Sequence, residues 1–406
     1  MKKPTLFLCA ICVLLSGCGN RNQKESEISD NSAFIENEPI DYNKVYFIDL
    51  EQRIKESKVD TFTINRLAKN ITFTPLETTD KALLMTTHFK VIPTNERYYI
   101  SSGTMGSFSG IMEFDVTGRY IDCLILKEGR GPKELPRIPE WAFNRNRQLL
   151  VASSLYEILV HSLENSTTNK YSLGDFFCYI CVLNDGTMVG VPNVVAENGD
   201  TGTPYLHFRN QEGEIVKSLF YTQKRDITSP PEGRSPFETY HIFPVYSGDA
   251  LFKDMFNDTI YRIRSMDEIK PYLIIHRGSL TLTPKDNSSR ATIDQKVLIL
   301  GLLETEKLIF IKYWHKEVSN CAIWDKRTQS FISNLNDTEN NGSGPINRYS
   351  HSFTKYRTPN GKEILIAILD YFDGKLYSVL DAAQAMEFLP DIKEDDNPVL
   401  MVIELK

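Results

Sequence analysis

The side chains best suited to chemistry lie in and just after a recurring glycine–proline loop. It reads Glu128-Gly129-Arg130-Gly131-Pro132, returns as Glu232-Gly233-Arg234-Ser235-Pro236, and has a third copy at Asn341-Gly342-Ser343-Gly344-Pro345. His241 and His351 follow the second and third copies. Guanidinium groups recognise carboxylates or sugar hydroxyls, and imidazoles bind metals or move protons. We predict that these groups line one mouth of a channel as a binding face: Glu128, Arg130, Glu232, Arg234, His241 and His351.

A structural alternative applies to the same residues. Arg130 and Arg234 can tie their own loops together through the neighbouring glutamates. His241 and His351 can be packed or surface histidines without a ligand. The sequence leaves both interpretations open.

Cys178 and Cys181 have the spacing of a redox or metal pair. They lie in the run 176–183, which is predicted to be a strand. Residues three apart on a strand point to opposite faces, so one strand cannot easily present both thiols to a metal. No further ligands follow at the spacing of a zinc site. We therefore expect two packed, apolar thiols, and neither a metal nor a cofactor.

Familiar catalytic motifs are missing from the sequence. The segment Gly129-Arg130-Gly131 lacks the lysine and the following helix of a phosphate-binding loop, and Pro132 removes a backbone donor. The chain has no Gly-x-Ser-x-Gly elbow and no His-Glu-x-x-His helix. A catalytic site assembled from distant segments stays open as an alternative.

The elements that must position these residues are predicted to be short strands. Runs at 45–50, 71–76, 98–102, 110–115, 120–126, 149–153 and 156–162 are bounded by turn residues. Only 50–57 and 382–389 are expected to be helical, the second with Asp381 as its N-cap. The sequence therefore favours an all-β fold.

An aromatic residue or histidine followed by a polar residue recurs along the chain. The pairs are Phe114-Asp115, His161-Ser162, Phe208-Arg209, Tyr261-Arg262, Trp324-Asp325 and Tyr377-Ser378. Their intervals of 47, 47, 53, 63 and 53 residues are close to the length of a four-stranded propeller blade. Six such units predict a six-bladed β-propeller. A β-sandwich followed by a second β domain is the alternative.

A propeller must pair its two ends to avoid an open edge. The apolar run 399–405 can pair with 71–76 or 45–50. The chain resembles the six-bladed β-propeller lipoproteins of Bacteroidetes, related in shape to NHL-type and TolB-like propellers. That resemblance implies fold and location rather than an activity, and it rests on Thr74-Pro75-Leu76-Glu77-Thr78, Phe114-Asp115-Val116-Thr117-Gly118, Gly129-Arg130-Gly131-Pro132, Asp258-Thr259-Ile260-Tyr261 and Asp396-Asn397-Pro398-Val399-Leu400.

The N-terminus is typical of an exported lipoprotein. Lys2 and Lys3 precede an apolar run, which ends in Leu15-Ser16-Gly17-Cys18. This segment resembles the bacterial lipoprotein signal, in which the chain is cut before a cysteine that is then lipidated. We predict a signal peptide at 1–17, a lipidated flexible tether at 18–40 and a propeller at 41–406. An ordinary signal peptide with an incidental cysteine is the alternative.

The net charge of the chain excludes one class of partner. Without Lys2 and Lys3, the chain has 44 basic and 53 acidic residues, which argues against nucleic acid. We predict a binding or scaffold module held on the outer membrane by its N-terminal lipid, facing the periplasm or the cell surface, with a protein, peptide or glycan partner. The alternative is a propeller lyase or hydrolase with a metal in its channel.

Overall fold

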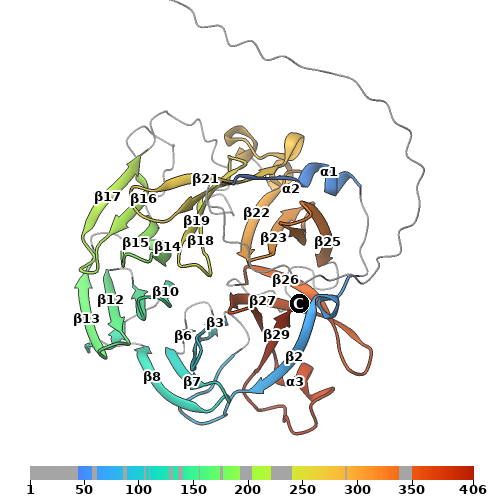
Figure 1. Ribbon diagram of the computed structural model, residues 1–406. Coiled ribbons are helices and arrows are strands. Elements are labelled where there is room, and N and C mark those ends of the chain that lie inside the picture. Colours follow the sequence, from blue (N-terminus) through green and yellow to red (C-terminus); the bar gives the residue numbers. More distant parts are fainter. Residues whose placement is uncertain are drawn as a thin grey trace, which may run out of the picture. The chain divides into compact units, whose positions relative to one another are not determined.

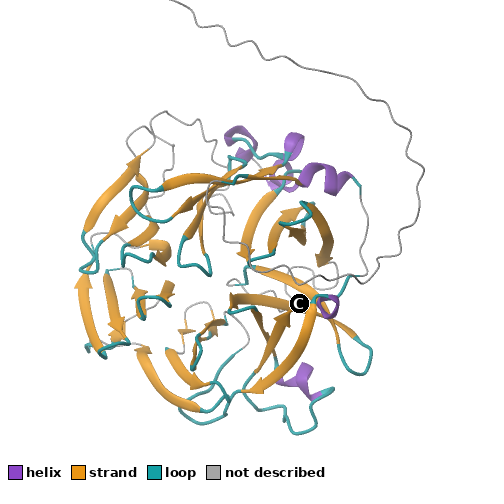
Figure 2. Cartoon of the chain, viewed as in Figure 1, coloured by secondary structure: helices purple, strands orange, loops and turns teal. Residues whose placement is uncertain are grey.

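Six antiparallel sheets stand as blades around a central channel (Figures 1 and 2). The computed structural model describes residues 44–56, 62–85, 89–104, 107–108, 110–127, 131–135, 140–154, 156–173, 177–192, 204–220, 240–288, 290–337 and 350–406. Within a blade, consecutive strands are neighbours; the first strand lies nearest the channel in blades 1 to 5, and the end of the second strand does so in blade 6. The six-bladed β-propeller predicted from the repeat is confirmed.

The first three blades take up the chain from residue 90 to residue 220. Blade 1 contains β3 (Lys90–Pro93), β4 (Arg97–Ser101), β7 (Ile111–Asp115) and β8 (Tyr120–Lys127), with β9 (Glu134–Leu135) added in parallel. A separate hairpin is formed by β5 (Gly103–Thr104) and β6 (Ser107–Phe108). Blade 2 contains β10 (Glu140–Asn144), β11 (Leu149–Ser153), β12 (Glu157–Ser162) and β13 (Thr167–Ser172). Blade 3 contains β14 (Phe177–Val182), β15 (Met188–Pro192), β16 (Pro204–Arg209) and β17 (Ile215–Phe220).

The other three blades extend to the C-terminus. Blade 4 contains β18 (Tyr240–Pro244), β19 (Ala250–Asp254), β20 (Thr259–Ile263) and β21 (Ile269–His276). Blade 5 contains β22 (Leu298–Glu304), β23 (Leu308–His315), β24 (Val318–Asp325) and β25 (Ser330–Asp337). Blade 6 contains β26 (Ser352–Arg357), β27 (Glu363–Phe372), β28 (Lys375–Leu380) and β29 (Val399–Leu405).

All six of the recurring sequence pairs lie on the third strand of a blade: β7, β12, β16, β20, β24 and β28. In blades 1, 2, 3 and 5 the pair ends the strand, as the repeat predicts. In blades 4 and 6, Tyr261 and Tyr377 lie in mid-strand instead. The repeat therefore identifies the right strand in every blade, although its register shifts in two of them.

The ring is closed by a strand near the N-terminal side of the described chain and the last strand at its C-terminus, as predicted. Strand β2 (Ala68–Pro75) pairs antiparallel with β29 and then leads into β3 of blade 1. Strand β29 is well buried, because Val399, Leu400, Met401 and Ile403 are all 0% exposed. The earlier run behaves differently: β1 (Tyr46–Asp49) adds a parallel fifth strand to β21 of blade 4.

Helices are short and lie outside the blades. Within the described ranges they are α1 (Leu50–Lys55), α2 (Arg290–Asp294) and α3 (Ala382–Met386), with the 3₁₀ turns η1 (Ile64–Arg66), η2 (Gly278–Leu280) and η3 (Pro284–Ser288). Asp381 is the N-cap of α3, as expected, and it forms a capping box with Gln384. The sequence did not predict α2 and the 3₁₀ turns, since so few residues show no helical periodicity. No helix within the described ranges is long and apolar enough to cross a membrane.

Most of the hydrophobic core lies between neighbouring blades. Trp324 of blade 5 and Tyr272 of blade 4 are almost fully buried in one such layer. Tyr46 of β1 meets both rings edge-on, with centroid distances of 5.5 Å to Trp324 and 5.6 Å to Tyr272. This packing explains why β1 joins blade 4, and it leaves the innermost strands to line the channel.

Candidate functional site

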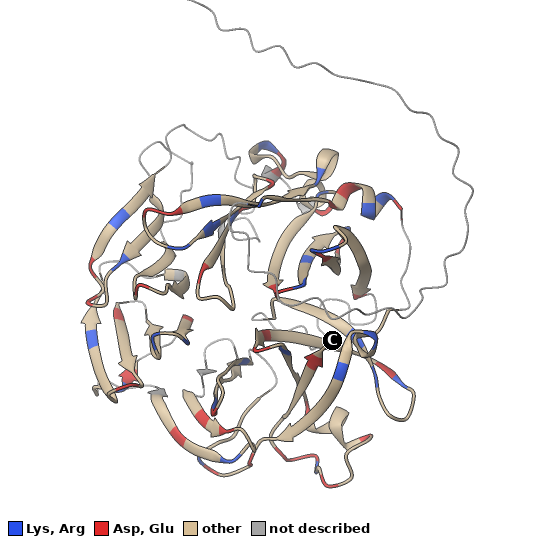
Figure 3. Ribbon diagram, in the orientation of Figure 1, with Lys and Arg blue, Asp and Glu red and all other residues tan. Residues whose placement is uncertain are grey.

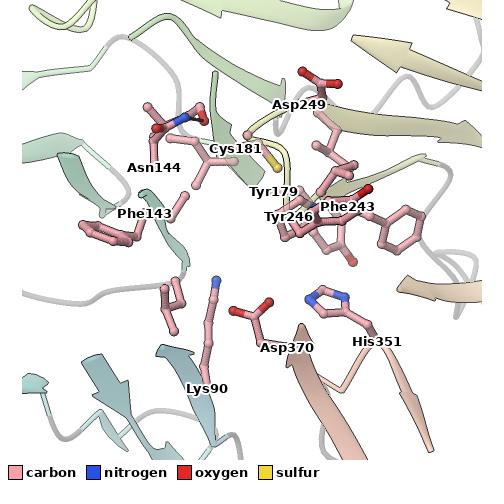
Figure 4. Close-up of a pocket in the computed structure, with 18 of the residues that line it drawn as sticks. Lys90, Phe143, Asn144, Tyr179, Cys181, Phe243, Tyr246, Asp249, His351 and Asp370 are labelled. Carbon is pink, nitrogen blue, oxygen red and sulfur yellow. Dashed lines mark hydrogen bonds between the residues drawn. The ribbon is translucent and has the colours of Figure 1, made fainter. Parts of the chain in front are cut away.

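A cavity of about 120 Å³ lies in the central channel, with lining residues from all six blades (Figure 4). Strands β3, β10, β14, β18 and β22 contribute from blades 1 to 5. In blade 6, the end of β27 packs beside β3 and β22, so Leu369 and Asp370 reach the cavity together with Ser350 and His351. The site therefore exists only when the ring is closed.

One ion pair joins blades 1 and 2 in the cavity wall. Lys90 begins β3 and Glu140 begins β10, and the Lys90 Nζ lies 2.8 Å from the Glu140 Oε1. The Lys90 ammonium also donates to the backbone carbonyl of Trp141 and lies over the indole ring, 4.9 Å from its centroid. Its donors are thus directed at the protein itself.

A second ion pair joins blade 2 to blade 6. Arg145, in the hairpin after β10, donates from Nη2 to the Asp370 carboxylate and from Nε to the Pro93 carbonyl at 2.8 Å. Its guanidinium lies 4.8 Å from the centroid of the Phe372 ring. Burial raises the pKa of Asp370, and the nearby Arg145 opposes that rise. Arg145 thereby links three blades.

The third carboxylate of the lining, Asp249, belongs to a buried charge network. Its Oδ2 lies 4.0 Å from the Nε of Arg262, which also pairs with Glu304. Lys326 donates to the same Glu304 carboxylate, and the Arg262 guanidinium lies over the Tyr272 ring. Burial raises the pKa of Asp249, while Arg262 lowers it. Each charge in the described lining therefore has a counter-charge nearby.

Four rings form an aromatic row along one side of the cavity: Tyr179, His241, Phe243 and His351. Within this row, His241 lies between Tyr179, at a centroid distance of 5.2 Å, and Phe243, at 5.7 Å and nearly parallel. His351 meets Phe243 edge-on at 6.3 Å. The row joins blades 3, 4 and 6, and Figure 4 shows the His351 ring directed towards the cavity.

Both histidines of the row are held neutral. Burial, with a smaller effect from Lys253, lowers the pKa of His241 to about 4. Burial lowers the pKa of His351 to about 3, aided by the positive charges of Lys90 and Lys312. A neutral imidazole has one donor and one acceptor nitrogen. Within the described residues neither ring makes a hydrogen bond, so both can offer these groups to a ligand.

Three hairpins beside the cavity are joined through Asn184. Its Oδ1 accepts from the Asn146 side chain at 2.8 Å in blade 2, and its Nδ2 donates to the Ser247 carbonyl at 2.8 Å in blade 4. Gly248 packs against this amide with φ +85°, and a Cβ there would lie 2.1 Å from the Asn184 Oδ1. Only glycine suits this position without a shift.

The predicted site residues fall into two groups. His241 and His351, from separate blades, both line the cavity. Cys18, Glu128, Arg130, Glu232 and Arg234 lie outside the described residues, so their roles stay predictions.

The described end of the first glycine–proline loop lies at the outer rim. Lys170, on the outermost strand of blade 2, donates to the Glu134 carbonyl at 3.0 Å. Gly131 donates its N–H to the Glu134 carboxylate at 2.8 Å. Gly131 and Glu134 are thus held away from the channel mouth where the loop was expected. In the chain, this segment lies between β8 of blade 1 and β10, the first strand of blade 2.

The cysteine pair is described only in part. Cys181 is buried in β14, and burial raises the pKa of its thiol, in keeping with a packed side chain. The side chain of Cys178 lies outside the described set. Within the described residues, no three His, Cys, Asp or Glu side chains form a group able to hold a metal ion.

Sequence reasoning missed the charged residues Lys90, Glu140, Arg145 and Asp370. Their one signal is positional: Lys90 and Glu140 each stand at the start of a short apolar strand. That signal is weak, because charged residues commonly flank strands.

Comparisons with solved structures support the fold. A Bacteroides fragilis protein named as an exported protein matches this chain with 15% identity and a TM-score of 0.62. The match covers 89% of this chain and 100% of that protein. A member of the DUF4221 family from Bacteroides vulgatus matches 84% of this chain over 97% of its own, with 11% identity and a TM-score of 0.50. A search of curated proteins finds no match.

A family model matches residues 45–404, from just before β1 to the last residue but one of β29. That range includes all six blades and every residue of the cavity lining. The chain therefore belongs to the family described as a domain of unknown function, DUF4934.

Proposed function

We propose that this protein is an extracytoplasmic lipoprotein whose propeller binds a partner through its central channel. The observation that carries the proposal is the cavity itself. Six blades contribute to it, and it combines the aromatic row with polar groups whose positions are fixed by contacts to the protein. Concave sites with aromatic walls and a few placed polar groups are typical of ligand binding.

Rigidity of the wall supports binding. Arg145 is held by Pro93, Asp370 and Phe372, and the Asn184 contacts fix the hairpins of three blades. A site that is already ordered loses little conformational entropy when a ligand arrives. The enzymatic alternative has less support, because no described histidine of the cavity is hydrogen-bonded to a nucleophile or a carboxylate.

Location is proposed from the N-terminal sequence. The lipoprotein-like segment ending at Cys18 would carry the lipid, and residues 19–40 would be the tether between the membrane and the propeller. A structurally similar Bacteroides fragilis protein is named as exported, which agrees with this proposal. Figure 3 shows basic residues intermingled with acidic ones over the blades, a distribution that suits a partner other than nucleic acid.

The test compares two substitutions of similar size in the full-length, membrane-anchored protein. Leu300 of β22 lines the cavity, so Leu300→Trp should fill it. Ile121, on the outermost strand of blade 1, is 43% exposed, and Ile121→Trp serves as the control. Circular dichroism would first verify that both variants fold.

Ligands are then recovered from native membranes and culture medium and identified by mass spectrometry. A ligand retained by the wild type and Ile121→Trp, but lost by Leu300→Trp, supports the proposal. Equal retention by all three proteins would place binding outside the channel. Turnover of the recovered molecule would replace the binding role with an enzymatic one.

A further inference from the structure

The charges in the described part of the channel lining are matched in number and position. The carboxylates in the described lining are Glu140, Asp249 and Asp370, and their respective cations are Lys90, Arg262 and Arg145. Both histidines of the row are neutral near pH 7 because burial lowers their pKa values. A charged ligand would have to displace one of these partners and leave its former counter-charge uncompensated.

The groups of the cavity that can still form hydrogen bonds are two neutral imidazoles and one guanidinium nitrogen. The imidazoles of His241 and His351 each combine a donor with an acceptor. The Nη1 of Arg145 makes no hydrogen bond within the described residues, since Nε and Nη2 carry its contacts. A hydroxyl group both donates and accepts, so it can satisfy an imidazole in either orientation without adding charge.

Size and shape restrict the ligand further. The cavity of about 120 Å³ is comparable to the roughly 150 Å³ cavity known to hold one benzene ring. A sugar ring with its hydroxyls is larger than benzene, so the cavity takes part of one such ring, and the rest of the glycan must lie outside it. The aromatic row supplies an apolar wall on which the C–H face of such a ring can pack.

We propose that the channel binds the terminal unit of a neutral glycan, with the sugar ring against the aromatic row and its hydroxyls on His241, His351 and Arg145. This inference rests on the proposed binding function and adds the class of ligand. The Arg145–Asp370 and Lys90–Glu140 pairs then have a second role. In each pair the two charges neutralise each other, so neither is available to attract a charged ligand.

The experiment uses full-length protein in detergent and isothermal titration calorimetry. The probes are gluco-, manno-, xylo- and galacto-oligosaccharides, oligogalacturonides as acidic counterparts of the galacto series, and short Lys-rich and Asp-rich peptides. We expect at least one neutral series to bind, with affinity changed less than about twofold by raising salt from about 0.05 M to 0.5 M, because no net charge is exchanged. Leu300→Trp should weaken that binding by at least about tenfold, and Ile121→Trp should leave it unchanged.

The variant Asp370→Asn tests the charge argument independently, since it leaves the Arg145 guanidinium without its carboxylate. This variant should gain salt-sensitive affinity for oligogalacturonides that the wild type lacks. Methyl esterification of those oligomers should abolish the gain.

The outcomes separate the two proposals. If an acidic or basic probe binds the wild type in a manner sensitive to Leu300→Trp, the channel is a binding site but the neutral-glycan inference is wrong. If no neutral series binds, that inference is also overturned. If the native ligand recovered from membranes is insensitive to Leu300→Trp as well, the channel-binding function fails with it.

Discussion

Arg145 and Asp370 show how much of the channel depends on single residues. Their side chains are only 15% and 18% exposed, and they connect the hairpin of blade 2 to the second strand of blade 6. A part-buried ion pair adds little stability beyond an apolar pair, but removing one partner leaves an uncompensated charge. The pair is therefore more important for geometry than for net stability.

We expect Asp370→Asn to lower the free energy of unfolding by about 2–4 kcal/mol, since Arg145 loses its carboxylate in a site of low exposure. Urea unfolding followed by fluorescence would measure the change. Glu387→Gln is the matched control, because Glu387 pairs with Lys362 where both side chains are well exposed. The control should cost less than about 1 kcal/mol. Equal losses in the two variants would contradict a structural role for the channel pair.

Acid sensitivity should follow from the two histidines of the row. The folded-state pKa values are about 4 for His241 and about 3 for His351, both below the unfolded value near 6.5. Below about pH 6.5 the unfolded chain binds more protons than the folded one, so stability falls as the pH falls towards about 4. Each ring contributes a slope of at most about 1.4 kcal/mol per pH unit.

The double variant His241→Gln, His351→Gln should therefore show a flatter loss of stability between about pH 6.5 and 4 than the wild type. Comparing the two proteins at each pH cancels the effect of all other titrating groups. Parallel curves would mean that both rings titrate alike in the folded and unfolded states.

Among the elements, β29 and β1 make different contributions although both pair segments far apart in the chain. Strand β29 lies between β28 and β2, and it contains four side chains that are fully buried. Strand β1 is an added edge strand in which Ile48 alone is fully buried. Closure of the ring thus depends on β29, whereas β1 reinforces one blade.

A chain ending at Pro398 should fail to fold. Each of the four buried side chains of β29 contributes about 1.5–3 kcal/mol, and their sum is similar to a typical net stability of about 5–15 kcal/mol. Replacing Tyr46–Asp49 by a Gly-Ser linker should instead cost roughly 2–4 kcal/mol and keep a cooperative melt. Circular dichroism during heating distinguishes these outcomes. Cooperative melting of the truncated chain would show that the ring closes without β29.

At the scale of the whole molecule, the proposed lipid at Cys18 attaches the protein to the membrane. Cys18→Ala should move the protein out of the membrane fraction, because the lipid is the proposed apolar attachment. Fractionation after labelling with a radioactive fatty acid measures both the location and the modification. Cys123→Ala, in β8 of blade 1, is the control and should remain labelled and membrane-bound. A Cys18→Ala protein that still sediments with membranes would contradict the lipoprotein assignment.

The repeat along the chain was sufficient to predict the architecture. Each blade needs a third strand of similar length that ends near a turn, so the aromatic–polar pairs recur at blade intervals, from Phe114-Asp115 to Tyr377-Ser378. The apolar run 399–405 predicted closure for the same local reason, because an apolar strand must be covered. These features depend on neighbouring residues and on strand periodicity, which a sequence records directly.

The site was determined by tertiary structure. Lys90 meets Glu140 across 50 residues, and Arg145 meets Asp370 across 225, so no local pattern could pair them. His241 and His351 were recognisable as candidates, yet their low pKa values come from burial in a cavity that forms only when six blades close. The sequence by itself determined the all-β class and the number of blades, because these follow from short-range periodicity and from the repeat. Only the closed ring decided which charges are matched and which rings face the channel, because those contacts join residues far apart in the chain.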